Sequence, residues 1–204
     1  MFCLVLAMMF VRFFSLIGAF FLLSSQVLAA SRELPVSADG CAIHFALTGQ
    51  VGAGCVPPAR AELGAERRLP PAGFDTAAAS LDSVPEEQGY FIRFPFNSDD
   101  LTEEYKAHLA RLGRVLNAPK LAQSCIKLVG HADSVGGPAY NRRLSDARAR
   151  AVAAALASAS QVDMGRIATE ARGETALLRG IPGPHPLNRR VEILARPSNG
   201  TRCK

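Results

Sequence analysis

The sequence of 204 residues predicts an α/β fold, more closely an α+β sandwich, in which the helices pack on one face of a mixed sheet. Three observations support this prediction. Large apolar residues alternate over residues 90–96, an apolar stripe runs along residues 101–117, and residues 143–158 are rich in strong helix formers. Shorter apolar segments follow these helices, which gives the order strand, helix, strand, helix, strand, strand.

The first strand and the first helix are joined by a polar turn. Apolar side chains recur at every second position from Tyr90 to Phe96, which is typical of a half-buried strand. Asp100 stands three residues before Glu103, a spacing that favours the start of a helix. We expect this helix to continue to about Asn117, with its leucines on one face.

The second half of the chain repeats the alternation of strand and helix. Residues 126–129 form a short apolar segment that predicts a strand, and residues 130–139 predict a loop with tight backbone. A helix follows over residues 143–158. Residues 167–171 and 189–194 predict two further strands, and a loop rich in Gly and Pro joins them. The helices separate the first three strands, so we expect layers of helix and sheet.

The N-terminal segment has the composition of an export signal. Arg12 precedes an apolar run from Phe13 to Leu23, and small residues follow it up to Ala29. This order predicts a secretory signal peptide over residues 1–29, cleaved after Ala29. An uncleaved membrane anchor remains the alternative, because the apolar stretch is about long enough to span a bilayer.

A segment with many Pro, Ala and Gly residues follows the leader. We interpret residues 30–89 as a spacer that gives the following domain reach, and as a region able to meet a protein partner in the envelope. Its short apolar patch, Ala42–Leu47, lies between Cys41 and Cys55 and predicts a small stapled element. Residues 197–204 are interpreted as a tail.

Four cysteines follow the predicted leader: Cys41, Cys55, Cys125 and Cys203. An even number in an exported chain favours disulfides. A bond between Cys41 and Cys55 closes a loop of about 15 residues, worth roughly 3 kcal/mol in the chain-entropy model. Cys125 and Cys203 are then the remaining pair, although the sequence alone leaves three connectivities open. The spacings do not match a zinc site.

Composition excludes several classes of function. The net charge is +5, but acidic residues are interleaved with the basic ones and Trp is absent, which argues against nucleic-acid binding. Too few alternating strands are present for a closed transmembrane sheet of its own. His131, Asp133 and His185 lack metal-ligand spacing, and no GxSxG motif occurs. We therefore expect no enzyme activity, no metal and no cofactor.

Three motifs occur in order: FPFNSDDL at 94–101, GHADSVGGPAYNRRLSDARAR at 130–150, and NRRVEI at 188–193. Together they resemble the OmpA-like C-terminal domain that OmpA, Pal and MotB share. The resemblance covers residues 90–196 and implies a β-α-β-α-β-β fold. It also implies non-covalent binding of peptidoglycan through the diaminopimelate of the stem peptide.

The resemblance also implies which residues bind. It gives the ligand ammonium to Asp133 and the ligand carboxylate to Arg148, and it adds supporting residues, namely Asn141, Asn188, Arg189 and Asn97. An Asp and an Arg held a few ångströms apart suit a zwitterion. Asn141, Ser145 and Arg148 are spaced to share one helical face. A structural ion pair between Asp133 and Arg148 is the alternative, since such pairs also occur without ligands.

One position departs from the family pattern. Ala132 stands where the family usually has Thr, so we expect the loss of one polar contact that the Thr hydroxyl makes to the ligand or the loop. We expect binding itself to be retained. We expect Phe91, Phe94 and Phe96 to serve as core and strand edge rather than as a platform for sugar rings.

These expectations place the protein in the periplasm or on the periplasmic face of the outer membrane, bound to peptidoglycan. The alternative function is an envelope scaffold or assembly protein that keeps the fold and has lost wall binding. A motor-stator component ranks lower, because the apolar run contains no acidic residue.

Overall fold

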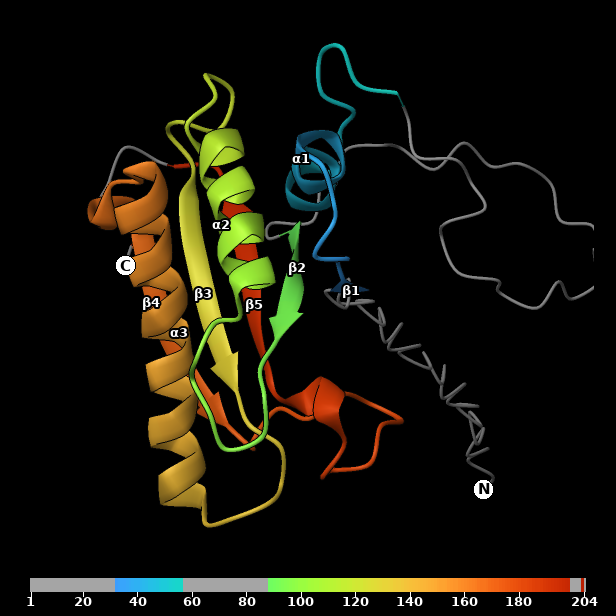
Figure 1. Ribbon diagram of the computed structural model, residues 1–204, viewed down its shortest axis with the longest axis vertical. Helices are drawn as coiled ribbons and strands as arrows, with labels where there is room; N and C mark the ends of the chain where they lie inside the picture. Colours follow the sequence, from blue (N-terminus) through green and yellow to red (C-terminus); the bar gives the residue numbers. More distant parts are fainter. Residues whose placement is uncertain (1–31, 57–87, 199–202, 204) are drawn as a thin grey trace, which may run out of the picture.

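A computed structural model describes residues 32–56, 88–198 and 203, and its centre is a five-stranded mixed sheet (Figure 1). The strands lie in the order β1-β2-β5-β3-β4. Their bounds are Arg32–Glu33 for β1, Gln88–Arg93 for β2, Cys125–His131 for β3, Ile167–Gly173 for β4 and Arg190–Arg196 for β5. β5 runs antiparallel to both of its neighbours, whereas β1 with β2 and β3 with β4 are parallel. The predicted mixed sheet is confirmed.

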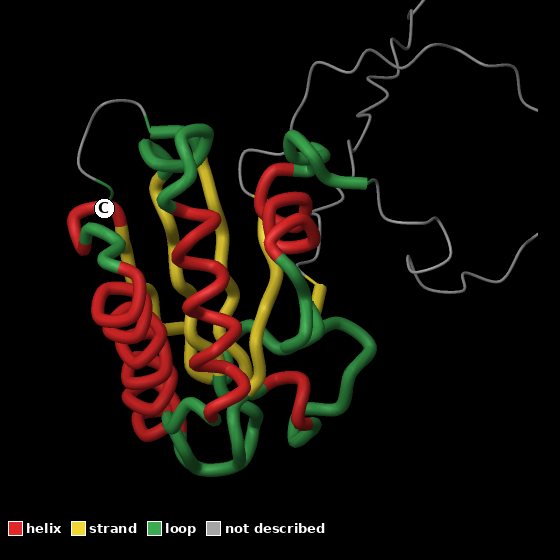
Figure 2. Tube along the Cα trace, turned by 45° about the horizontal axis from the view of Figure 1, so that its top comes forward, coloured by secondary structure: helices red, strands yellow, loops and turns green. Residues whose placement is uncertain are grey.

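Three α-helices cover one face of this sheet (Figure 2). They are α1 (Gly40–Thr48), α2 (Glu103–Leu116) and α3 (Pro138–Ser160). Short 3-10 turns, η2 (Met164–Arg166) and η3 (Pro186–Asn188), precede β4 and β5. One apolar core joins the helices to the sheet, with side chains such as Ile43, Leu112, Leu156, Ile92 and Ile193 fully buried. No α-helix of the described segments is long and apolar enough to cross a membrane.

Both long helices begin at residues that differ from the prediction. α2 is capped by Thr102, whose hydroxyl accepts a hydrogen bond of 3.3 Å from the backbone N–H of Tyr105. Asp100 is not the cap, because its carboxylate accepts from Ser98 inside the preceding turn, at 3.0 Å. α3 begins at Pro138, well before the expected residue 143. Proline suits the first turn of a helix, where its missing N–H is not needed.

Part of the expected spacer belongs to the fold. β1 pairs with β2, and α1 buries Ile43 and Leu47 in the core. Residues 30–89 are therefore not a spacer throughout, because two apolar residues four positions apart give α1 a face that packs. Residues 57–87 lie outside the described residues, as does the predicted signal peptide, residues 1–29.

Two disulfides connect the cysteines in the pairing first considered. Cys41–Cys55 joins the start of α1 to the loop that follows it. Cys125–Cys203 joins the first residue of β3 to the segment expected to be a tail. The tail is thus tied covalently to the sheet.

A close approach between β3 and α3 positions the loop that follows β3. A Cβ atom added at Gly130 would overlap the carbonyl oxygen of Ser145, so only glycine fits there. The hydroxyl of Ser145 accepts a hydrogen bond of 2.9 Å from the backbone N–H of Gly173, at the end of β4. The ends of β3 and β4 are therefore held against the same turn of α3.

Candidate functional site

Three loops meet at one end of the sheet. β2, β3 and β4 run in the same direction and β5 runs against them, so the ends of three strands lie beside the start of the fourth. The loops at this end are residues 94–102, 132–137 and 174–189, at the lower end of the molecule in Figure 1. Every residue that the sequence nominated for binding lies in these loops or on α3 beside them.

Arg148 holds two of these loops together. Its Nε donates to the carbonyl oxygen of Ser98 at 2.9 Å, Nη2 donates to that of Pro95 at 3.0 Å, and Nη1 donates to that of His131 at 3.0 Å. The guanidinium also lies over the ring of Phe94, at 5.4 Å from its centre. The residue has no exposed surface, and its hydrogen bonds fix the loop after β2.

Asp133 pairs with Arg189 rather than with Arg148. Its Oδ2 accepts a hydrogen bond of 3.0 Å from Nη1 of Arg189, and its Oδ1 accepts one of 3.1 Å from the backbone N–H of Val135. Only 4% of Asp133 is exposed. The structural ion pair of Asp133 with Arg148 that was considered above is therefore not formed, and Asp133 pairs instead with the residue before β5.

Two arginines and one carboxylate share this small volume. Burial lowers the pKa of Arg148 to about 10, the charge of Asp133 opposes this, and the charge of Arg189 adds to it. Arg148 stays protonated at neutral pH. The carboxylates of Asp99 and Glu174 also lie at this end of the sheet, so the site presents both signs of charge, which suits a ligand group that carries an ammonium and a carboxylate.

Asn141 connects α3 to both neighbouring loops. Its side-chain amide donates to the backbone oxygen of Asp133 at 3.2 Å and also to the carboxylate of Glu174. Asn141, Ser145 and Arg148 are all buried on one face of α3, as the spacing predicted. The loop carrying Asp133 and the helix carrying Arg148 do converge.

Asn188 organises the loop before β5 from within. Its oxygen accepts from the backbone N–H of Leu178 at 2.9 Å, and its nitrogen donates to the carbonyl oxygens of Pro182 and Gly183, each at 3.0 Å. The side chain is fully buried, so it shapes the loop that presents Arg189 and does not line a free surface.

The remaining nominated residue, Asn97, lies at the rim with two aromatic neighbours. Its backbone φ is 52°, and its side-chain oxygen accepts a hydrogen bond from the hydroxyl of Tyr140. Phe96 is exposed, with the guanidinium of Arg189 over its ring at 5.7 Å from the centre. The expectation for the aromatic set is therefore wrong for Phe96, whereas Phe91 and Phe94 are buried.

Sequence reasoning missed Glu174 and Tyr140 as parts of this site. Glu174 follows β4 in a loop rich in Gly and Pro, where no local periodicity marks it. Tyr140 is on the first turn of α3, inside the motif, but the predicted loop ended at residue 139 and the predicted helix began at residue 143, so Tyr140 was assigned to neither. Its place two residues after Pro138 was the signal that could have put it on a helix.

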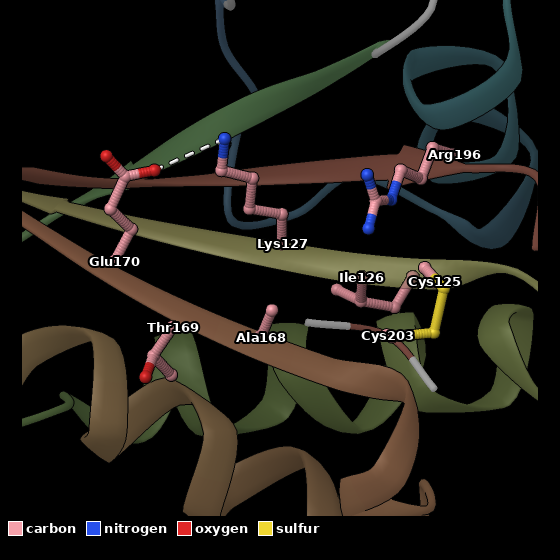
Figure 3. A pocket seen from close by; sticks show the side chains of 8 residues that line it. All are labelled: Cys125, Ile126, Lys127, Ala168, Thr169, Glu170, Arg196 and Cys203. Carbon is pink, nitrogen blue, oxygen red and sulfur yellow. Dashed lines mark ion pairs between the residues drawn. A yellow bond between two sulfur atoms is a disulfide. The ribbon is translucent and has the colours of Figure 1, made fainter. Parts of the chain in front are cut away.

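A separate cavity of about 280 Å³ lies away from the site, towards the end of the sheet where β3 begins and β5 ends (Figure 3). It is lined by the Cys125–Cys203 disulfide and by side chains of β3, β4 and β5 that include Lys127, Glu170 and Arg196. Lys127 and Glu170 form an ion pair of 3.2 Å beside it. None of the nominated binding residues lines this cavity.

Residues 93–181 match the model of the OmpA family, and this match runs from the last residue of β2 through β4 into the loop that precedes β5. The chain contains an OmpA-like domain. The structure extends that domain beyond the match, because β5 lies between β2 and β3 and completes its sheet. The fold expected from the motifs is confirmed, with β1 and α1 added at its edge.

Two curated relatives are similar to part of this chain. Outer membrane protein Omp38 of Acinetobacter baumannii is 31% identical over 79 residues, which are 39% of this chain and 22% of that protein. Outer membrane porin F of Pseudomonas aeruginosa is 30% identical over 103 residues, which are 50% of this chain and 29% of that protein. The chain thus spans less than a third of the length of these relatives.

Solved structures of OmpA-like domains are similar as well. The domain of FopA1 from Francisella tularensis subsp. tularensis SCHU S4 has 21% identity and a TM-score of 0.47, covering 63% of this chain and 93% of its own. The peptidoglycan-associated lipoprotein from Burkholderia pseudomallei has 25% identity and a TM-score of 0.45, and the match covers 52% of this chain and 89% of its own. The cell wall anchor of the T6SS from Pseudomonas aeruginosa has 28% identity and a TM-score of 0.45, and the match covers 55% of this chain and 82% of its own.

Proposed function

We propose that this protein binds peptidoglycan non-covalently through its OmpA-like domain, without enzymatic activity, and so holds or organises the cell envelope on its periplasmic side. The observation that supports this most is the grouping of Asp133, Arg189 and Arg148 at the end of the sheet, because it provides both signs of charge for a zwitterion. One solved structure of this fold is named a peptidoglycan-associated lipoprotein and another a cell wall anchor.

The proposed ligand group is the diaminopimelate of the stem peptide, which carries an ammonium and a carboxylate at the free end of its side chain. In this proposal Asp133 accepts hydrogen bonds from the ammonium, and the guanidinium groups of Arg148 and Arg189 face the carboxylate. Arg148 has five N–H donors, of which three bond to carbonyl oxygens, so two remain for a ligand. Asn141 and Asn188 fix the loops that present these groups.

The test is co-sedimentation of the oxidised protein with purified peptidoglycan, with free meso-diaminopimelate as competitor. Asp133→Asn keeps the shape and the bond to Val135 but removes the charge, and we expect it to abolish sedimentation. Asp146→Asn is the matched control, because Asp146 also lies in the motif but pairs with the exposed Arg150. Equal binding by the two variants would contradict the assignment of the site.

A second candidate function is favoured by one observation. Asp133 and Arg148 expose 4% and 0% of their surface, so both charged groups of the site are buried. A scaffold protein that keeps the fold but no longer binds peptidoglycan needs no accessible ligand site, and this buried arrangement is sufficient for it. Failure of a folded sample to sediment with peptidoglycan would select the scaffold and direct attention to the β1–α1 segment as a surface for a protein partner.

A further inference from the structure

Four large apolar side chains stand exposed around the buried charged site. Phe96 is 61% exposed, Val135 43%, Tyr140 41% and Leu177 37%. Three come from the three loops of the site end and Tyr140 comes from the first turn of α3. Together they make up most of the exposed large apolar residues in the described part of the chain. We name this set the apolar rim. Exposed apolar groups gathered in one place usually mark a surface that binds something.

Contacts with the site hold the rim in place. The guanidinium of Arg189 bonds to Asp133 and lies over the ring of Phe96, at 5.7 Å. The hydroxyl of Tyr140 donates to Asn97, the neighbour of Phe96 in the chain. The ring positions are therefore set before any ligand arrives, which lowers the entropy that binding must remove.

The polar composition of the rim points to the kind of partner. Asn97 follows Phe96 in the chain and accepts a hydrogen bond from the hydroxyl of Tyr140, so an amide group lies beside these two aromatic residues. A sugar ring has the same mixture, with C–H groups on its faces and hydroxyl or acetamido groups at its edges. Stem peptides carry small side chains and offer little apolar surface to an aromatic ring. Amphipathic rings that pair an apolar body with a polar edge suit such a partner.

We propose that the apolar rim, through Phe96 and Tyr140, binds the N-acetylated sugar next to the stem peptide whose diaminopimelate enters the charged site. This inference rests on the proposed function and adds a second contact to it. The charged site takes the end of one side chain, and the rim takes the polymer from which the peptide extends. The glycan thus contributes affinity that a free peptide lacks.

The test compares two probes by titration calorimetry: a disaccharide-tripeptide fragment of peptidoglycan that contains meso-diaminopimelate, and the same tripeptide without its sugars. The quantity of interest is the ratio of their affinities. We expect the wild-type protein to prefer the sugar-bearing probe by about three- to tenfold, the range of an aromatic contact. Phe96→Ala and Tyr140→Ala should each bring the ratio towards one. A general effect of Phe96→Ala through Arg189 changes both affinities and cancels in the ratio.

Met164→Ala is the matched control, because Met164 is also exposed, at 53%, but lies in η2 before the start of β4, at the other end of the sheet. Its ratio should equal that of the wild type. A wild-type ratio of one, or a ratio that survives both rim substitutions, would overturn the sugar contact while leaving the charged site intact. Binding of neither probe to the folded wild type would instead reject the proposed function itself.

Discussion

The phenol of Tyr90 and Nε2 of His108 form a hydrogen bond of 2.9 Å in the core, and both side chains are fully buried. Nδ1 of His108 lies 3.3 Å from the carbonyl oxygen of Val36, in the segment before α1. A carbonyl only accepts, so Nδ1 carries the proton and Nε2 accepts from Tyr90. A neutral His108 therefore links β2, α2 and the N-terminal segment.

Stability should consequently fall in mild acid. Burial lowers the pKa of His108; the bond to Val36 opposes this, and the charge of Arg111 adds to it. The unfolded chain binds a proton at His108 below about pH 6.5, whereas the folded protein binds it only at lower pH. The free energy of unfolding therefore decreases as the pH drops from about 6.5 towards the lowered pKa. Urea unfolding at about pH 7.5 and 5.5 measures this loss.

The variant His108→Gln should lose less stability over the same interval than the wild type. His185→Gln, which changes an exposed ring in the loop before β5, is the matched control and should keep the dependence of the wild type. Equal losses in His108→Gln and the wild type would assign the pH dependence to other groups.

Replacing Arg148 by Met should destabilise the fold as well as the site. Three carbonyl oxygens lose their donors, and each unsatisfied group costs about 1–3 kcal/mol. We expect a loss of at least about 3 kcal/mol in urea unfolding. Arg150→Met, two residues along α3, removes an exposed guanidinium that pairs with the half-buried Asp146, and it should change stability by less than about 1 kcal/mol. Similar losses in both variants would show that the carbonyl contacts do not hold the loops.

The close packing of β3 on α3 predicts a cost for the smallest addition to Gly130. Gly130→Ala forces the strand away from the carbonyl oxygen of Ser145, and we expect about 2 kcal/mol or more of destabilisation. Gly40→Ala is the control, because its added methyl would meet Val115 at an ordinary 3.5 Å. Thermal unfolding of the two variants checks the difference, and a neutral Gly130→Ala would mean that β3 and α3 are more loosely packed than described.

The two disulfides should differ in their contribution to stability. Cys125–Cys203 spans 78 residues and Cys41–Cys55 spans 14. In the chain-entropy model these loops are worth roughly 4.5 and 3 kcal/mol. Paired substitutions to Ser, compared with the oxidised wild type in urea, should show the larger loss for the long loop. The reverse order would indicate that α1 depends on its disulfide for more than loop closure.

Periodicity was enough to place the residues of α3 that face the site. Asn141, Ser145 and Arg148 recur at helical spacing, and the structure buries all of them on one face. The pairing of Asp133 with Arg189 was beyond such reasoning, because 56 residues separate them and only the topology of the sheet brings them together. A sequence motif identifies the charged residues, but it does not predict which of the two arginines forms the ion pair with the carboxylate.

The small stapled element between Cys41 and Cys55 is confirmed, whereas the start of α2 and the packing of residues 32–56 on the domain were mispredicted for different reasons. Asp100 and Thr102 both suit a helix cap, and the choice falls to Thr102 because Asp100 is occupied by Ser98. The sequence around α1 does not indicate what α1 packs against, because its partners, β2 and α2, follow it by tens of residues. Composition favoured a spacer, and a few apolar contacts outweighed it.

The last strand of the described residues, β5, lies in the middle of the sheet. Until residues 190–196 exist, β2 and β3 have no neighbour between them, and their hydrogen-bonding edges stay open. A nascent or truncated chain that ends before β5 therefore cannot assemble the sheet, however well its helices form. Folding of this domain must wait until β5 has been translated, and a premature stop before residue 190 leaves an unfolded product for proteases to remove.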